Sequence, residues 1–283
     1  MRLNSSLKSF FALYFTALIF CVGARIWLKL NAMDASTGFY IGNDGLVSAL
    51  VWGFNTVLGV YVAALFLFYL LRRTERDYPV MRSDRLIAFF ALLTGVAGAL
   101  YQLETLGVTR FVTDSPGVEM SGITLIISVV LGAFTALAFI FMGLRTLFGR
   151  GYMHGGVLSL IGGVWMMLTM VFKFNSYTTL TTISDNLLAV LFMLFCALFM
   201  AGHARTLVGI GRKDGRNYTI PSGLSSSLFG ILLVVPNWIW VFANGASALP
   251  APMLGTYESV FVFFMSIYSL LFVRHICLTI RSV

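Results

Sequence analysis

Charged side chains are scarce in this chain. Lys, Arg, Asp and Glu together make up 11% of its 283 residues, whereas 59% are hydrophobic, and the mean hydropathy is +0.90. A soluble domain of this length could not bury so large an apolar fraction. The composition therefore predicts that lipid surrounds most of the chain, and it excludes an ordinary soluble domain.

The sequence also lacks motifs of catalysis, nucleotide binding and metal binding. It contains no HExxH, no phosphate-binding loop with its lysine, no GxSxG and no CxxC pair. Its three cysteines, Cys21, Cys196 and Cys277, fall inside apolar runs, which is typical of small buried hydrophobic side chains. We therefore expect no catalytic residue, no metal site and no cofactor.

Long apolar runs are what the sequence has in abundance. About 20 apolar residues cross a bilayer as a helix, and these runs are continuous rather than alternating, which argues against a β-barrel. The sequence predicts an all-α, polytopic bundle of about eight transmembrane helices, with residues 1–283 forming one membrane domain and no soluble domain. The predicted spans are 9–29, 46–71, 86–107, 121–147, 156–174, 186–210, 223–243 and 258–280.

Basic residues are distributed unevenly between the two ends of these spans. If both termini are cytoplasmic, only Arg25, Lys29, Arg110 and Lys173 of the 19 basic residues fall at the outer side. Because Lys and Arg in short loops favour the cytoplasm, we predict an N-in/C-in protein of the plasma or inner membrane. The net charge of +8 then reflects topology, and we expect no nucleic-acid partner.

The spans suggest four helical hairpins in series. An acid stands at the outer start of each even span (Asp44, Glu119, Asp185, Glu258), and each odd span ends in mixed aromatic and polar residues. Acids are favourable at helix N-termini, where the helix carries partial positive charge. The pattern is therefore explained equally well by an old duplication or by anchors common to any up-and-down bundle.

Two further features concern helix packing. Ser128, Gly132 and Ala136 follow one another at four-residue spacing, which predicts close approach of another helix to this face. Pro236 removes one backbone hydrogen bond from the seventh span and predicts a kink. Interrupted helices beside polar side chains such as Asn237 often mark transporter sites, although proline is also tolerated in membrane helices for packing alone.

Polar residues recur at one depth near the outer ends of the spans. If they face one another, they line a vestibule for a small molecule or ion; if they face lipid headgroups, they are anchors. For an intramembrane ion pair, we expect Glu104 to meet Lys173 or Arg25. The candidate vestibule or ligand-binding residues are Arg25, Asn55, Gln102, Glu104, Lys173 and Asn237.

The three histidines, His154, His203 and His275, all fall near the predicted cytoplasmic ends. His203 and His275 occupy matching places in the sixth and eighth spans, but two haem ligands would both have to point inward at one depth. No other feature indicates haem, so we expect interfacial histidines.

Three functions remain open. The common depth of the polar residues narrowly favours a small-solute transporter or permease-like binding protein. The alternative is a non-catalytic membrane subunit or scaffold, as a homo-oligomer or with a membrane protein partner that docks on the basic loop 72–85 or 211–218. A membrane-embedded enzyme is the weakest of the three, because no residue cluster argues for one.

Overall fold

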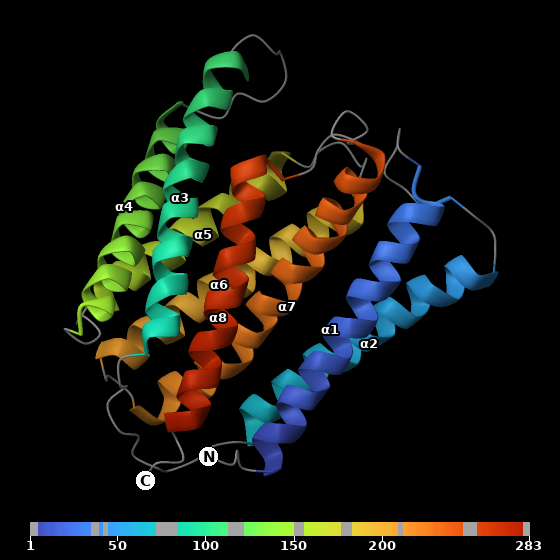
Figure 1. The fold of residues 1–283 in the computed structure, drawn as a ribbon, viewed down its shortest axis with the longest axis horizontal. Helices are drawn as coiled ribbons and strands as arrows, with labels where there is room; N and C mark the ends of the chain where they lie inside the picture. The colour runs from blue at the N-terminus through green and yellow to red at the C-terminus, as the bar shows by residue number, and fades with distance from the viewer. Residues whose placement is uncertain are drawn as a thin grey trace.

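In the computed structural model, the described residues form eight α-helices (Figure 1). Residues 5–34, 40–41, 45–71, 84–112, 122–149, 156–176, 183–208, 212–245 and 254–279 are described. The helices are α1 (Ser5–Ala32), α2 (Gly45–Leu71), α3 (Arg85–Val112), α4 (Gly122–Leu147), α5 (Gly156–Ser176), α6 (Ile183–Val208), α7 (Arg212–Asn244) and α8 (Thr256–Thr279).

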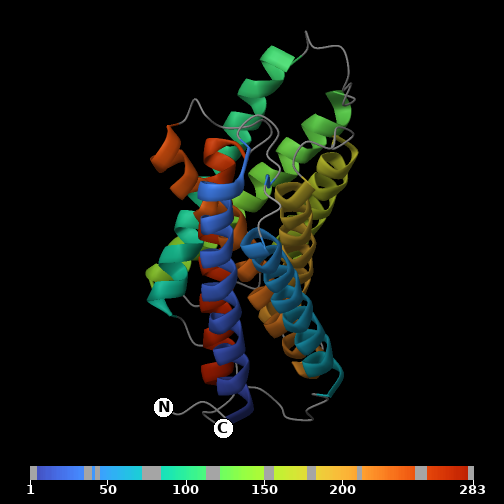
Figure 2. The same ribbon diagram turned by 90° about the vertical axis from the view of Figure 1, so that its right-hand side faces the viewer.

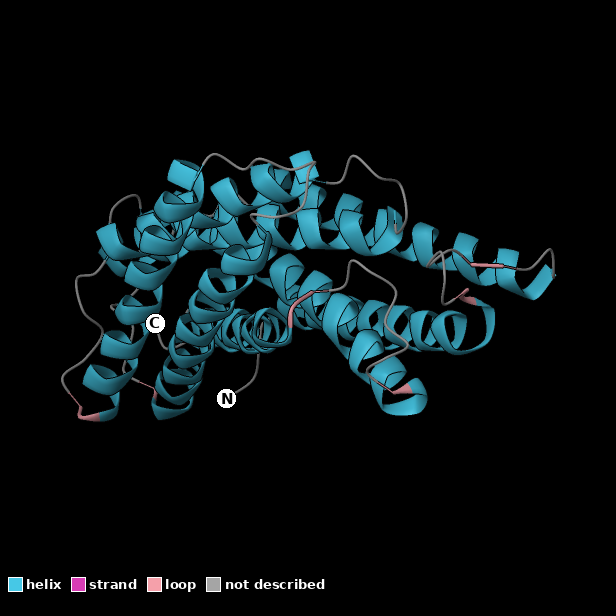
Figure 3. Cartoon of the chain, turned by 90° about the horizontal axis from the view of Figure 1, so that it is seen from above, coloured by secondary structure: helices cyan, strands magenta, loops and turns pink. Residues whose placement is uncertain are grey.

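The prediction of an all-α polytopic membrane bundle is confirmed. Seven of these helices are long and apolar enough to cross a bilayer, while the apolar part of α5, Leu158–Phe174, is shorter. Figure 3 shows helix throughout nearly all of the described chain, seen from one end of the bundle. The start of α1 and the end of α8 lie at the same end in both Figure 1 and Figure 2, as an even number of antiparallel helices requires.

Helix α7 differs most from its predicted span, which was 223–243. It begins at Arg212 and continues through Pro221 and Pro236. The polar stretch before Gly223 lowers hydropathy but does not prevent helix formation, and its Thr219 packs beside Gly202 of α6. The hydropathy criterion therefore finds the lipid-crossing part of this helix and misses its polar beginning.

The helices are arranged as a ring with a hairpin at its side. Helices α3, α4, α5, α6, α7 and α8 each pack against the next, and α8 packs against α3 to close the ring. The α1–α2 hairpin contacts α7, on the side of the bundle away from α3 and α4 (Figure 1). We call the contact of α1 and α2 with α7 the seam.

Close helix contacts stabilise the ring where glycine allows them. A Cβ atom on Gly95 of α3 would lie 2.7 Å from the backbone nitrogen of Ile140 and 2.8 Å from the carbonyl oxygen of Ala136, both in α4. Gly132 of α4 meets the side chain of Gln102 in α3. The predicted close approach to the small face of the fourth span is therefore present, and the helix it meets is α3. Lipid supplies no hydrophobic driving force between helices, so such packing supplies much of the stability.

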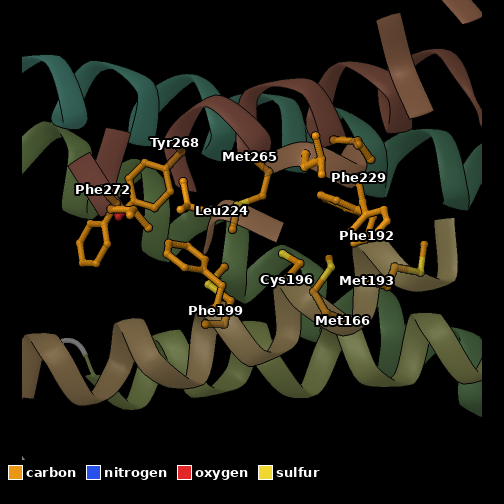
Figure 4. Close-up of a cluster of buried hydrophobic side chains, with 14 of the residues drawn as sticks. Met166, Phe192, Met193, Cys196, Phe199, Leu224, Phe229, Met265, Tyr268 and Phe272 are labelled. Carbon is orange, nitrogen blue, oxygen red and sulfur yellow. The ribbon is translucent and has the colours of Figure 1, made fainter. Parts of the chain in front are cut away.

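The ring interior is filled by aromatic and sulfur-containing side chains. Figure 4 shows Phe192, Phe199, Tyr268 and Phe272 converging from α6 and α8, together with Met166 of α5. The ring of Phe261 stacks on that of Tyr101 with centroids 6.0 Å apart and lies 5.3 Å from that of Trp165. The ion pairs among the described residues lie outside this aromatic core, and those at one end of the bundle define the candidate sites.

Candidate functional site

Two ion-pair clusters lie at one end of the bundle, where α1, α3, α5 and α7 end and α2, α4, α6 and α8 begin. We call this the ion-pair end. The seam cluster comprises Arg25, Lys29, Asp185 and Asn237. The ring cluster comprises Tyr101, Glu104, Lys173 and Glu258.

The seam cluster joins the α1–α2 hairpin to the ring. The Asp185 carboxylate of α6 pairs with the Arg25 guanidinium through one oxygen and with the Lys29 ammonium through the other, the latter at 2.8 Å. Lys29 also donates a hydrogen bond to the side-chain oxygen of Asn237 in α7. Arg25 and Lys29 are each only 1% exposed. The two cations of α1 therefore reach groups that are distant in the chain.

Local helix geometry explains how these groups come together. Arg25 and Lys29 are four residues apart and so lie on one face of α1, near the C-terminal end of the helix, where positive charge is favourable. Asp185 is in the first turn of α6, where negative charge is favourable for the same reason. Each helix end therefore favours the charge that it carries, independently of the ion pair between the helices.

The charges of the seam cluster do not cancel. Two cations share one carboxylate, and the fourth member, Asn237, is neutral. Among the described residues, the Nε atom of Arg25 has no hydrogen-bond partner, although the phenol of Tyr40 lies near enough to interact with this guanidinium. The indole N–H of Trp240, one turn from Asn237 on α7, likewise has no partner among them. The cluster therefore combines excess positive charge with unused donors.

The ring cluster has more acidic than basic side chains. Lys173 of α5 pairs with Glu258 of α8, and the Tyr101 hydroxyl donates to the same carboxylate over a long 3.5 Å. A Glu104 oxygen accepts hydrogen bonds of 3.1 Å from the backbone N–H groups of Tyr257 and Glu258. Glu104 therefore caps the start of α8, and two carboxylates here face one ammonium.

The predicted vestibule residues divide between these clusters or fall outside them. Arg25 and Asn237 belong to the seam cluster, and Glu104 and Lys173 to the ring cluster. Gln102 is buried against α4 at Gly132. Asn55 is exposed on α2. The rotation of the helices thus places these six residues in two clusters and at two separate positions.

The ion pairs of Lys173 and Arg25 are formed with acids other than the predicted partner, Glu104. Lys173 pairs with Glu258, and Arg25 pairs with Asp185. Both true partners are acids that open an even helix, so the signal was present in the recurrent acids of the sequence. Equal depth in the membrane does not show which helices are neighbours, and the partner could not be chosen without that.

The position of His203 differs most from the one predicted from the sequence. Instead of lying at the interface it is fully buried in the ring. Its Nδ1 is 2.9 Å from the Ser159 hydroxyl and its Nε2 is 2.7 Å from the Tyr268 hydroxyl. The Phe272 ring lies 4.3 Å away, centroid to centroid. His275 differs, because it lies 3.6 Å from an Asp84 oxygen, and His154 lies outside the described residues.

No family model matches this chain, and no curated protein or solved structure shows significant similarity to it. Function must therefore be argued from the geometry and charge of the sites themselves. Within the described part of the chain, no group of three or more His, Cys, Asp or Glu side chains could hold a metal ion. The seam cluster is the stronger candidate site, since its excess charge is the more deeply buried.

Proposed function

We propose that this protein is a transporter of small anions and that the seam cluster is its binding site. One observation carries the proposal: Arg25 and Lys29 are almost fully buried and share a single carboxylate. A buried charge without a counter-ion is costly, and ionisable groups inside a membrane protein usually face a functional path. An anion at this position would balance the second cation.

The polar chemistry of the cluster suits an anion. Guanidinium and ammonium groups are the usual partners of carboxylates and other oxyanions, and hydrogen bonds between charged groups are the strong ones. The Nε–H of Arg25, which has no hydrogen-bond partner among the described residues, adds a donor. The bound anion is small, since the described side chains of the cluster are already packed against one another.

The orientation follows from the basic residues. With both termini in the cytoplasm of a cell or inner membrane, the ion-pair end is the outer end, and most Lys and Arg residues are inside. The seam cluster then lies where a solute arrives from outside.

A membrane subunit or scaffold is the second candidate, and α2 is the observation that favours it. Helix α2 packs mainly against α1 and less extensively against α7, and it exposes large side chains such as Trp52 and Leu46. Much of the basic loop 72–85 lies outside the described residues. A native mass spectrum of protein extracted in mild detergent distinguishes the two, because a subunit carries a stoichiometric protein partner or a second copy.

The transport proposal is tested with purified protein. Its thermal unfolding is measured at constant ionic strength in sodium chloride, formate, acetate or phosphate, with gluconate as the large reference anion. A ligand of the folded state raises Tm in proportion to ln(1 + [L]/Kd). We expect stabilisation by at least one small anion, and flux of the same anion into proteoliposomes. No stabilisation and no flux with any of the four would refute the proposal.

A further inference from the structure

A second group of polar side chains lies in the middle of the seam. The Tyr14 hydroxyl of α1 is 2.7 Å from the Ser227 hydroxyl of α7. The Tyr61 hydroxyl of α2 lies beside the Ser225 hydroxyl of α7, and the two tyrosine rings are 6.4 Å apart, centroid to centroid. All four side chains are at most 1% exposed. We call them the hydroxyl cluster.

The hydroxyl cluster is not saturated. Within the described residues, the Tyr61 and Ser225 hydroxyls approach each other, but in looser geometry than the pair of Tyr14 and Ser227. In the pair of Tyr14 and Ser227, one hydroxyl donates to the other and one hydrogen is left over. A buried hydroxyl that is poorly paired is destabilising, so the looser pair keeps a hydrogen-bond donor without a well-placed acceptor among the described residues.

The hydroxyl cluster lies on the same seam as the seam cluster. Tyr14 and Arg25 are eleven residues apart on α1, a rise of roughly 16 Å. Ser227 and Asn237 are ten residues apart on α7, a rise of roughly 15 Å. The two clusters are therefore successive polar levels along one helix–helix contact.

On α1, small side chains separate the two levels. The buried residues of α1 between Tyr14 and Arg25 are Ala17, Cys21 and Ala24. Alanine and cysteine occupy little volume, so this face of α1 obstructs a small solute less than the aromatic interior of the ring does. The sequence also has no charged residue in α1 between Ser9 and Ala24 or in α7 between Tyr218 and Asn244.

We propose that Tyr14, Tyr61, Ser225 and Ser227 form a second, mid-membrane site for a small monovalent anion on its way along the seam. This inference rests on the proposed function. Hydroxyl groups donate hydrogen bonds to an anion that has lost its water, and they add no charge. Binding is therefore weak enough for release, as conduction through successive sites requires. The chemistry fits a halide or a small carboxylate such as formate.

The first test removes the poorly paired hydroxyls. Tyr61→Phe and Ser225→Ala are prepared with Ser226→Ala as the matched control, because Ser226 lies beside the Cys196 thiol of α6. Chloride and formate fluxes are measured in proteoliposomes, and Tm shifts with the same anions are measured in detergent. We expect Tyr61→Phe to reduce flux at least tenfold, Ser225→Ala to reduce it less, and Ser226→Ala to leave it unchanged.

The controls separate this inference from the proposed function. In Tyr61→Phe the anion-dependent Tm shift of the seam cluster should persist, since Arg25 and Lys29 are intact. A purely structural role predicts instead that removal of a poorly paired buried hydroxyl leaves flux unchanged and the protein equally or more stable. Wild-type flux that survives Tyr61→Phe but is lost in Arg25→Gln would overturn the second site while supporting the first. Absence of wild-type flux would overturn both.

The native cysteine between the two levels provides an independent test. In a Cys196→Ala, Cys277→Ala double variant that retains flux, Cys21 is the sole thiol. We expect iodoacetate to alkylate Cys21 in proteoliposomes, and we expect excess chloride or formate to slow the reaction several-fold. Alkylation by neutral iodoacetamide measures the intrinsic reactivity of the thiol. Reaction with iodoacetamide but not with iodoacetate would contradict an anion path along the seam, as would a rate unaffected by chloride and formate.

Discussion

The ammonium group of Lys29 lies 2.8 Å from a carboxylate oxygen of Asp185, although 156 residues separate them in the chain. The same carboxylate also meets Arg25. This three-charge arrangement fastens the α1–α2 hairpin to α6 of the ring, and Lys29 extends it to α7. Because two cations share one carboxylate, removing a cation and removing the carboxylate should have opposite effects on anion binding.

Changing the cations and the carboxylate of the seam cluster should move anion binding in opposite directions. Arg25→Gln leaves Lys29 and Asp185 as a neutral pair, so the anion-dependent rise in Tm should disappear. Asp185→Asn leaves two buried cations and should cost about 3–5 kcal/mol of folding free energy without added anion. Anion at 100 times its Kd should restore about 2.7 kcal/mol.

Thermal unfolding across an anion titration measures both variants, and Arg205→Gln is the matched control because its side chain is exposed on α6. An Asp185→Asn variant that is no more dependent on anion than the wild type would contradict the assigned charge balance.

The ring cluster should affect stability without affecting anion binding. Lys173→Met leaves the carboxylate of Glu258 without its ammonium partner, which destabilises the protein. The Lys173 side chain is 21% exposed, so solvent screening keeps the loss below the 3–5 kcal/mol typical of a fully buried pair. Equilibrium unfolding in mixed micelles gives the cost, and the anion-dependent Tm shift should equal that of the wild type. A lost shift would mean that Lys173 also belongs to the anion site.

Gly95 tests the contact between α3 and α4. An added methyl group would meet the backbone of Ile140 and Ala136 in α4, which cannot move aside as a side chain could. We expect Gly95→Ala to destabilise by about 1–3 kcal/mol through overpacking. Gly59→Ala in α2 is the control, because a Cβ there has nothing within 4 Å, and it should be neutral or stabilising. Equal unfolding free energies for the two variants would show that the helices can separate without cost.

The buried histidine gives a test inside the ring. Tyr268→Phe removes the hydroxyl that lies 2.7 Å from His203 Nε2 and leaves a buried ring nitrogen unpaired, at a cost of about 1–3 kcal/mol. Tyr257→Phe, on a side chain that is 45% exposed, should change little. The free energies of unfolding of the two variants, measured in mixed micelles, test this difference. Anion flux should persist in both variants. Loss of anion flux in Tyr268→Phe would indicate that the anion path runs through the ring interior and not along the seam.

The sequence predicts the bundle well because hydropathy and length determine which segments cross a bilayer. It also places Asp185 and Glu258 at helix starts, through the dipole argument. It does not reveal that these two acids neutralise Arg25 and Lys173, since that depends on which helices become neighbours and how each is rotated. Asn55 illustrates the same limit: its depth resembles that of Arg25, yet it faces outward from α2.

His203 escaped prediction for a related reason. Near a helix end, a histidine followed by alanine and arginine is typical of the membrane interface. Its burial depends on Ser159 and Tyr268, which come from two other helices and carry no recognisable spacing. When a polar network takes one residue from each of three helices, no single helix shows a periodic sequence pattern that predicts it.

The attachment of the hairpin to α6 and α7 has a consequence for biosynthesis. Lys29 is translated 156 residues before Asp185, which is about 8–30 s at 5–20 residues per second. Two cations without a counter-ion are poorly tolerated in lipid, so α1 must wait at the insertion machinery or the headgroup layer during that interval. Helix α1 is thus made before α6 and settles only after it, and a slowed ribosome lengthens its exposure to quality control.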